Sequence, residues 1–222
     1  MTDKKIVVVA GAGGRAGRFV VQELVKRGCR VRAISRQAAA QLQQGVEYVQ
    51  ADLSSVASLE KVMQGAQFVI SAIGSKKPFS KAENDKIDNM GNQNLARAAK
   101  AKGIQQFVLI SSIGAGNSRD AVSCIYKWLM TPVLRAKDKS EAFIQSCGID
   151  YTIIRPGGYT EKDMPPEVAF GEGGKLTGMV RREQIARVCV DALEKPAMKN
   201  RIFEVVARAA VKEGREQFIV KV

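Results

Sequence analysis

The chain has 222 residues, 45% of them apolar and 26% charged, a composition typical of one folded domain with a core of its own. It contains no histidine, which excludes serine–histidine catalysis, histidine-ligated metal sites and histidine proton relays. The net charge of +13 indicates an anionic partner, but the basic runs are too short and the aromatic residues too few for a nucleic-acid interface.

Short β-branched runs alternate with segments of helical spacing along the chain. The predicted strands are Ile6–Ala10, Val31–Ile34, Val46–Val49, Phe68–Ala72, Phe107–Ile110, Tyr151–Ile154 and Ile202–Val206. The predicted helices are Arg15–Arg27, Ser54–Met63, Glu83–Lys102, Glu183–Leu193 and one that begins at Thr131-Pro132 and ends near Cys147. This alternation predicts an α/β fold, a Rossmann-like, doubly wound, mainly parallel sheet with helices on both faces.

Residues 1–222 are expected to form a single domain. The stretch Gly157–Gly178 is rich in glycine and proline and lacks periodicity, which predicts a long irregular loop that acts as a lid over the substrate. Phe218–Val222 is a candidate edge strand. The four cysteines lie far apart and form no CxxC pair, so we expect no metal site and reduced thiols, as in the cytoplasm.

A glycine-rich segment joins the first predicted strand to the first predicted helix. Its residues are Gly11, Ala12, Gly13, Gly14, Arg15, Ala16 and Gly17. The first glycine permits a tight turn, Gly13 or Gly14 lets the backbone approach a pyrophosphate, and the last allows close packing of helix on strand. Free N–H groups at the helix start favour the phosphate charge. The segment therefore predicts a dinucleotide site.

The end of the second predicted strand indicates which dinucleotide binds. NAD-selective sites place an acidic residue there, which accepts a hydrogen bond from the ribose 2′-hydroxyl. Here Ser35 and Arg36 follow Ile34, and no acid is present. Arg36 suits a charge-assisted contact with a 2′-phosphate, and Ser35 adds a hydroxyl. The expected cofactor is NADP(H).

Further motifs accompany the glycine segment. They are Ile34-Ser35-Arg36, Ala51-Asp52-Leu53, Ser71-Ala72-Ile73-Gly74, Gly91-Asn92-Gln93-Asn94-Leu95, Phe107–Ser112, Lys137 with Glu141, and Tyr151–Gly157. From about Lys4 to Val206 the chain resembles the atypical short-chain dehydrogenases/reductases of the NAD(P)H-binding, NmrA-like group. Biliverdin-IXβ/flavin reductases and the chloroplast import-associated NADP-binding subunit are similar in size and motif.

The resemblance implies roles for individual residues. It puts Asp52 and Leu53 at the adenine. Toward the nicotinamide it lines the cofactor with Ala72, Ile73, Gly74 and Pro156. It also puts Ser111 and Ser112 at the catalytic edge and Lys137 at the nicotinamide ribose. Ketone reductases of this kind also carry Tyr-x-x-x-Lys, in which the tyrosine donates the proton. Here Val133 stands four residues before Lys137, and none of the four tyrosines precedes a lysine at that spacing.

Without that acid, the site suits acceptors that stabilise negative charge by conjugation, such as flavins, quinones or tetrapyrroles. The first hypothesis is therefore an NADPH-dependent reductase of such an acceptor, with Ser111, Ser112 and Lys137 as its catalytic residues. The alternative is a non-catalytic NADP(H)-binding redox sensor or assembly factor. An acidic protein or a membrane surface is a further possible partner. The expected location is the cytoplasm, or the chloroplast stroma in a plant or alga.

Overall fold

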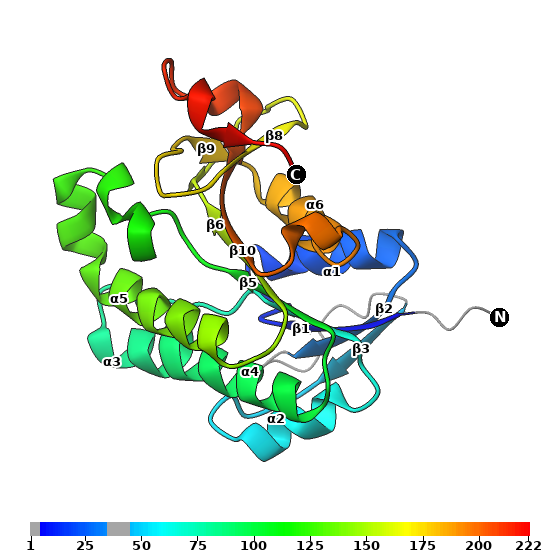
Figure 1. Ribbon diagram of the computed structural model, residues 1–222. Coiled ribbons are helices and arrows are strands. Elements are labelled where there is room, and N and C mark those ends of the chain that lie inside the picture. The colour runs from blue at the N-terminus through cyan, green and yellow to red at the C-terminus, as the bar shows by residue number, and fades with distance from the viewer. Residues whose placement is uncertain (1–4, 35–44) are drawn as a thin grey trace.

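One mainly parallel sheet organises the molecule (Figure 1). The computed structural model describes residues 5–34 and 45–222, so the predicted cofactor residues Ser35 and Arg36 lie outside the described residues. The strand order is β11-β8-β10-β6-β5-β4-β1-β2-β3. The parallel strands are β1 (Ile6–Ala10), β2 (Arg30–Ile34), β3 (Val46–Val49), β4 (Phe68–Ser71), β5 (Gln106–Ile110), β6 (Tyr151–Pro156) and β10 (Arg201–Ala207). β2 and β3 lie on one side of β1, and β4 and the later strands lie on the other side. The strand order therefore switches between β1 and β4, and α/β folds bind ligands at such a switch point.

Helices cover both faces of the sheet, as predicted (Figure 1). They are α1 (Gly17–Lys26), α2 (Val56–Met63), α3 (Lys81–Asn84), α4 (Asn92–Ala101), α5 (Cys124–Ser146) and α6 (Arg182–Asp191). Side chains of β1 alternate between two cores. Val7 and Val9 pack with α1 and α6, whereas Val8 and Ala10 pack with α2, α4 and α5. A strand buried on both faces explains the unbroken apolar run at Ile6–Ala10.

The long fifth helix differs from the prediction at its start. α5 begins after Ser123, whose hydroxyl accepts the N–H of Tyr126, and it continues through Pro132. The predicted start at Thr131-Pro132 is therefore wrong. Pro132 removes one main-chain hydrogen bond, the one to the carbonyl of Trp128, on a part of the helix that faces water. The Thr131 hydroxyl instead donates to the carbonyl of Lys127 at 2.5 Å.

Two other segments are also more structured than the sequence indicated. The predicted helix Glu83–Lys102 is a continuous helical run from α3 to α4, interrupted by a π-helical segment at Asp85–Gly91. The stretch Gly157–Gly178 contains β7 (Gly158–Tyr159), which pairs with β9 (Met179–Val180), and β8 (Val168–Gly171). β8 joins the main sheet antiparallel to β10 and to β11 (Ile219–Val220), so the edge strand predicted within Phe218–Val222 is confirmed.

Candidate functional site

The glycine turn after β1 is packed too tightly for side chains at two positions. Gly11 has φ +79°, and a Cβ there would lie 2.7 Å from the carbonyl oxygen of Ala72, which follows β4. A Cβ on Gly17 would lie 2.1 Å from the carbonyl oxygen of Gly11. The first contact brings the turn against the end of β4, and the second brings the first turn of α1 against the loop. Both glycines are thus required by close backbone approach.

The same turn presents free donors at the start of α1. Within the described residues, the backbone N–H groups of Gly13, Arg15 and Ala16 have no protein acceptor. Gly14 is also exposed, and its N–H donates to the carbonyl of Gly11 at 2.9 Å. Free N–H groups and the positive end of a ten-residue helix form a site for a pyrophosphate. The turn therefore fits the predicted dinucleotide.

The residues predicted to contact the adenine lie beside the π-helical segment. The Asp52 carboxylate accepts the N–H and the hydroxyl of Ser54, and these bonds hold the pKa of Asp52 below its ordinary value. A Cβ on Gly91 would lie 3.1 Å from Ile73 Cδ1 and 3.8 Å from Leu53 Cβ. Leu53 and Ile73, which are distant in the sequence, thus pack against one glycine. An exposed, ionised Asp52 borders this apolar surface.

A buried ion pair lies at the carboxyl end of β4, toward the predicted nicotinamide side. Asp88, only 1% exposed, accepts the N–H of Ser75 at 2.9 Å through Oδ2. Its Oδ1 is 3.1 Å from Lys137 Nζ, and a Cβ on Gly74 would lie 3.6 Å from the same oxygen. The structure therefore brings Lys137 and Gly74 together around Asp88, a residue that the sequence analysis missed.

The π-helical segment holds Asp88 in this position. The Ser71 hydroxyl at the end of β4 donates to Asn92 Oδ1 at 2.6 Å, and Asn92 Nδ2 donates to the carbonyl of Asp88 at 2.8 Å. π-Helical turns occur frequently at functional sites because they change which side chains face inward. The only sequence signal for Asp88 was the run of polar residues at Asn84–Asn94. This signal is not specific, because an ordinary surface helix is also rich in polar residues.

The two predicted catalytic serines already donate hydrogen bonds within the protein. Ser112 donates to the carbonyl of Ile113 at 2.9 Å. Ser111 is buried and donates to Glu141 through a short hydrogen bond. Its hydroxyl can donate to an acceptor molecule only if this bond is broken. Pro156, the last predicted cofactor residue, is buried at the end of β6, where its carbonyl accepts the N–H of Ile113 at 3.0 Å.

Glu141 on α5 belongs to a buried charge cluster with Arg155 on β6 and Glu204 on β10. Arg155 Nη2 lies 2.6 Å from Glu141 Oε2, and Arg155 Nη1 lies 3.5 Å from Glu204 Oε1. Asn117 accepts a further hydrogen bond from Arg155. Two carboxylates therefore share one guanidinium. Burial raises the pKa of Glu204, although the N–H of Gly174 and the charge of Arg155 oppose this rise.

Because the pKa of Glu204 is raised on folding, its contribution to stability is present below its ordinary pKa and is lost as the pH rises. We expect Glu204→Gln to increase the free energy of unfolding at neutral pH, because glutamine keeps an acceptor for Gly174 without a buried charge. The difference from the wild type should vanish below about pH 4, where glutamate is protonated in both states. Urea unfolding at several pH values measures this. A less stable variant at neutral pH would mean that the attraction to Arg155 outweighs the cost of burial.

Tyr126, Tyr151 and Tyr159 do not lie where the missing proton donor would be. Val133 is buried on α5, and Tyr126 precedes Lys137 by three helical turns, or roughly 16 Å along the axis. The hydroxyl of Tyr159 is buried without a hydrogen-bond partner among the described residues, and burial raises its pKa. The Tyr159 ring packs in the core of α1 and α6 and under Arg182. Tyr151 begins β6, at the opposite end of this strand from Pro156.

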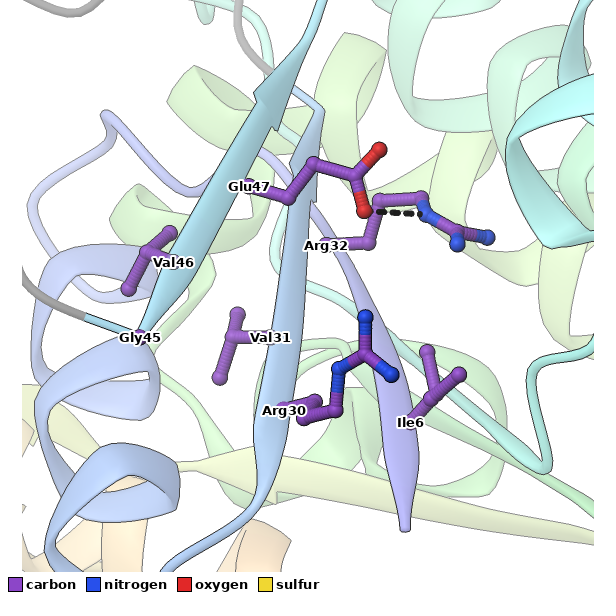
Figure 2. A pocket seen from close by; sticks show the side chains of 7 residues that line it. All are labelled: Ile6, Arg30, Val31, Arg32, Gly45, Val46 and Glu47. Carbon is purple, nitrogen blue, oxygen red and sulfur yellow. Dashed lines mark hydrogen bonds and ion pairs between the residues drawn. The ribbon is translucent and has the colours of Figure 1, made fainter. Parts of the chain in front are cut away.

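The cavity in Figure 2 lies away from this site. It measures about 300 Å³ and is lined by Ile6, Arg30, Val31, Arg32, Gly45, Val46 and Glu47. These residues belong to the amino-terminal halves of β1, β2 and β3, whereas the glycine turn follows the carboxyl end of β1. Arg32 Nε donates to Glu47 Oε2 at 3.0 Å across the cavity wall. The cavity therefore lies at the opposite end of these strands from the glycine turn.

Residues 5–34 and 45–222 contain no cluster of cysteine, aspartate and glutamate that could hold a metal ion. Within the same ranges, no helix combines the length and the apolar character that crossing a bilayer requires.

Comparisons with known proteins agree with this geometry. Residues 11–196 match a family described as NAD(P)H-binding. An uncharacterized chloroplastic protein of Arabidopsis thaliana is 33% identical over 219 residues, which cover 92% of this chain and 78% of that protein. The chloroplastic divinyl chlorophyllide a 8-vinyl-reductase of Arabidopsis thaliana is 33% identical over 198 residues. These cover 75% of this chain and 44% of the reductase, so the chain spans less than half of that enzyme.

Solved structures share the fold at low identity. An anaerobillin reductase from Escherichia coli O157:H7 superposes with a TM-score of 0.80 at 23% identity, over 92% of this chain and 98% of that one. A short-chain dehydrogenase/reductase from Veillonella parvula, solved in complex with NADP, superposes with a TM-score of 0.75 at 15% identity, over 94% and 97% of the two chains. These matches confirm the predicted Rossmann-like architecture.

Proposed function

The chain belongs to the NAD(P)H-binding family that residues 11–196 match, and from this premise we propose that it is a reductase of the atypical short-chain dehydrogenase/reductase type, which reduces a conjugated acceptor with NADPH. When bound, NADPH supplies the hydride. The glycine turn fits the cofactor, because its close packing at Gly11 and Gly17 leaves the exposed N–H groups of Gly13, Arg15 and Ala16 for the pyrophosphate. Asp52 and Leu53 are proposed to hold the adenine.

The Lys137–Asp88 ion pair carries the proposal. Asp88 is fixed by Ser75 and by the π-helical segment, so it holds the Lys137 ammonium at a defined place beside Gly74. An ammonium has further N–H donors, which suit the hydroxyls of the nicotinamide ribose. Lys137 is thus proposed to orient the cofactor for hydride transfer, with Asp88 as its positioning residue.

The acceptor class follows from the missing acid. Reduction of a simple ketone forms a basic alkoxide and needs a positioned proton donor, but Val133 occupies the tyrosine position. Hydride addition to a flavin, quinone or tetrapyrrole forms a delocalised anion, which takes its proton from water. Ser111 is held by Glu141 and is not required as an acid. Among these acceptors a tetrapyrrole has the most support, because a relative and a structural neighbour are named as reductases of chlorophyllide and anaerobillin.

We expect NADPH oxidation with a tetrapyrrole, flavin or quinone under anaerobic conditions, and none above background with simple ketones or aldehydes. Lys137→Ala should lower the rate by about 10- to 100-fold, because a charge-assisted contact to the cofactor is lost. The pH of the rate optimum should not move, because Lys137 donates no proton. Lys139→Ala is the matched control, since Lys139 lies on the same helix but is exposed and pairs with Asp85.

Efficient reduction of a plain ketone would contradict this mechanism. Tight NADPH binding without turnover of any acceptor would instead favour the alternative function, a non-catalytic NADP(H)-binding sensor or assembly factor.

Cofactor choice gives a separate prediction. We expect NADPH to bind more tightly than NADH, because Arg36 pairs with the 2′-phosphate. Such a contact contributes about 1.5–3 kcal/mol, so Arg36→Ala should remove roughly 10- to 100-fold of the preference and leave NADH affinity unchanged. Calorimetric titration with both nucleotides measures this. Equal wild-type affinity for the two nucleotides would rule out the role given to Arg36.

The relatives' names bear on location. Both Arabidopsis thaliana proteins are described as chloroplastic, which supports the chloroplast over the cytoplasm as the proposed compartment for a plant or algal chain. The expectation of a cytoplasmic protein is not confirmed.

A further inference from the structure

The first two turns of α5 expose a row of large apolar side chains. Ile125, Trp128 and Leu129 stand at positions i, i+3 and i+4, and therefore on one face of the helix. Ile125 is 73% exposed and Trp128 is 78% exposed, and Leu129 also faces water. Isolated apolar side chains are common on surfaces, but three on one helical face mark an interaction surface.

Two neighbouring features extend this apolar row. Further along the same face, Pro132 and Ala136 line a cavity of about 310 Å³ between α3 and α5, which lie side by side in Figure 1. Phe79, in the turn before α3, is 67% exposed. That turn is held in place because Asn84 Nδ2 donates to the carbonyl of Pro78 at 2.7 Å. The row, the cavity and Phe79 together form what we call the α5 face.

Positive charge borders the α5 face. Lys76, Lys77, Lys81 and Arg135 are exposed on the same elements or on the turn that carries Phe79, and none forms an ion pair within the described residues. Most carboxylates on these elements are paired. Asp85 pairs with Lys139 at 3.1 Å, Asp120 with Lys127 at 2.7 Å and Asp138 with Arg119 at 3.4 Å. Glu83 on α3 is the exception among the described residues. The α5 face is thus apolar with a cationic border.

We propose that the α5 face docks on an anionic lipid surface. Trp128, Ile125 and Leu129 enter the boundary between headgroups and acyl chains, and the bordering lysines contact anionic headgroups. This inference is independent of the proposed reductase function.

A second copy of the chain fits this face less well. A symmetric dimer would place the two cationic borders against each other. An aromatic side chain can bury about 150–250 Å² of its surface in an interface, and the aliphatic side chains can bury less. The exposed apolar side chains therefore provide only on the order of 500 Å², less than the roughly 800 Å² per partner of a standard interface.

Trp128 is the single tryptophan of the chain and reports directly on the docking. The probes are phosphatidylcholine vesicles with and without one third phosphatidylglycerol. We expect the wild-type protein to sediment with the anionic vesicles, and its fluorescence to shift to the blue and to be quenched by brominated acyl chains. Binding to pure phosphatidylcholine vesicles should be at least tenfold weaker, because the anionic headgroups are absent. Binding to the anionic vesicles should also weaken in high salt, because salt screens the attraction between charges.

Variants separate the apolar from the electrostatic contribution. Ile125→Gln with Leu129→Gln should lower partitioning about tenfold or more while Trp128 remains as the reporter. Lys76→Glu with Lys77→Glu should remove the dependence on phosphatidylglycerol. The matched controls are Met179→Gln, an exposed apolar residue on β9, and Lys195→Glu, an exposed lysine beyond α6; both should bind like the wild type. Circular dichroism checks that α5 remains folded.

Two outcomes would overturn the proposal. One is unchanged Trp128 fluorescence and no sedimentation with anionic vesicles. The other is a wild-type dimer in sedimentation velocity that Trp128→Gln converts to a monomer, which would make the α5 face an interface between copies of the chain.

Discussion

Replacement of Gly14 by valine should lower NADPH affinity by 100-fold or more and leave the domain folded. A Cβ at this position lies 3.0 Å from the carbonyl oxygen of Gly11, and a branched side chain projects from the exposed turn that carries the free N–H groups. The valine side chain therefore occupies the space that a pyrophosphate needs to reach those donors. Calorimetric titration with NADPH measures the loss, and thermal unfolding checks the fold.

Gly65→Ala is the matched control for this substitution. Gly65 has φ +72° with no atom within 4 Å of an added Cβ, so alanine there costs about 1 kcal/mol of stability through backbone strain alone. NADPH affinity should remain that of the wild type. Normal NADPH binding by the Gly14→Val variant would place the phosphate site elsewhere in the molecule.

Replacement of Arg155 by methionine should have the largest effect on stability, a loss of about 3–5 kcal/mol at neutral pH. The guanidinium lies 2.6 Å from Glu141 and 3.5 Å from Glu204, and all three side chains are buried. Methionine fills similar space but leaves two carboxylates without a counter-charge. The loss should shrink under acidic conditions, because protonation removes those charges in the folded state. Urea unfolding at neutral and acidic pH provides the measurement.

Arg119→Met provides the comparison for Arg155→Met. Arg119 pairs with Asp138 at 3.4 Å, and both side chains are about one third exposed, so the loss should stay below about 1 kcal/mol. A comparable loss of the free energy of unfolding in the two variants would show that the buried cluster stabilises the fold no more than a partly exposed ion pair does.

The strands and the glycine turn could be predicted from the sequence because their signals are local. The β-branched run at Ile6–Ala10 coincides with β1, since a strand buried between two helical layers needs little but apolar residues. The run predicted at Val46–Val49 coincides with β3, a partly exposed strand at the edge of the sheet. The spacing of Gly11 and Gly17 likewise reflects one turn, in which a side chain would meet the backbone. These features need no knowledge of distant residues.

The remaining features depend on contacts between distant segments. Pro132 looked like a helix start because its local preference is strong, yet α5 packs on β6, α4 and the π-helical segment, which outweighs one lost hydrogen bond. Ser111 looked available for catalysis, but its partner Glu141 lies 30 residues away. Asp88 was missed because the π-helical turn changes the inward-facing position, and a regular helical period does not predict this.

Pro132 also has a mechanical consequence for α5. A regular helix is stiff along its axis because each turn is tied to the next by hydrogen bonds, and Pro132 removes one of these ties. The turns before it carry Trp128, and the turns after it carry Lys137, which is held by Asp88. A force on the turns that carry Trp128 would therefore bend the helix at Pro132 more easily than elsewhere. The outer end of α5 is therefore coupled to the ion pair less rigidly than it would be through a fully hydrogen-bonded helix.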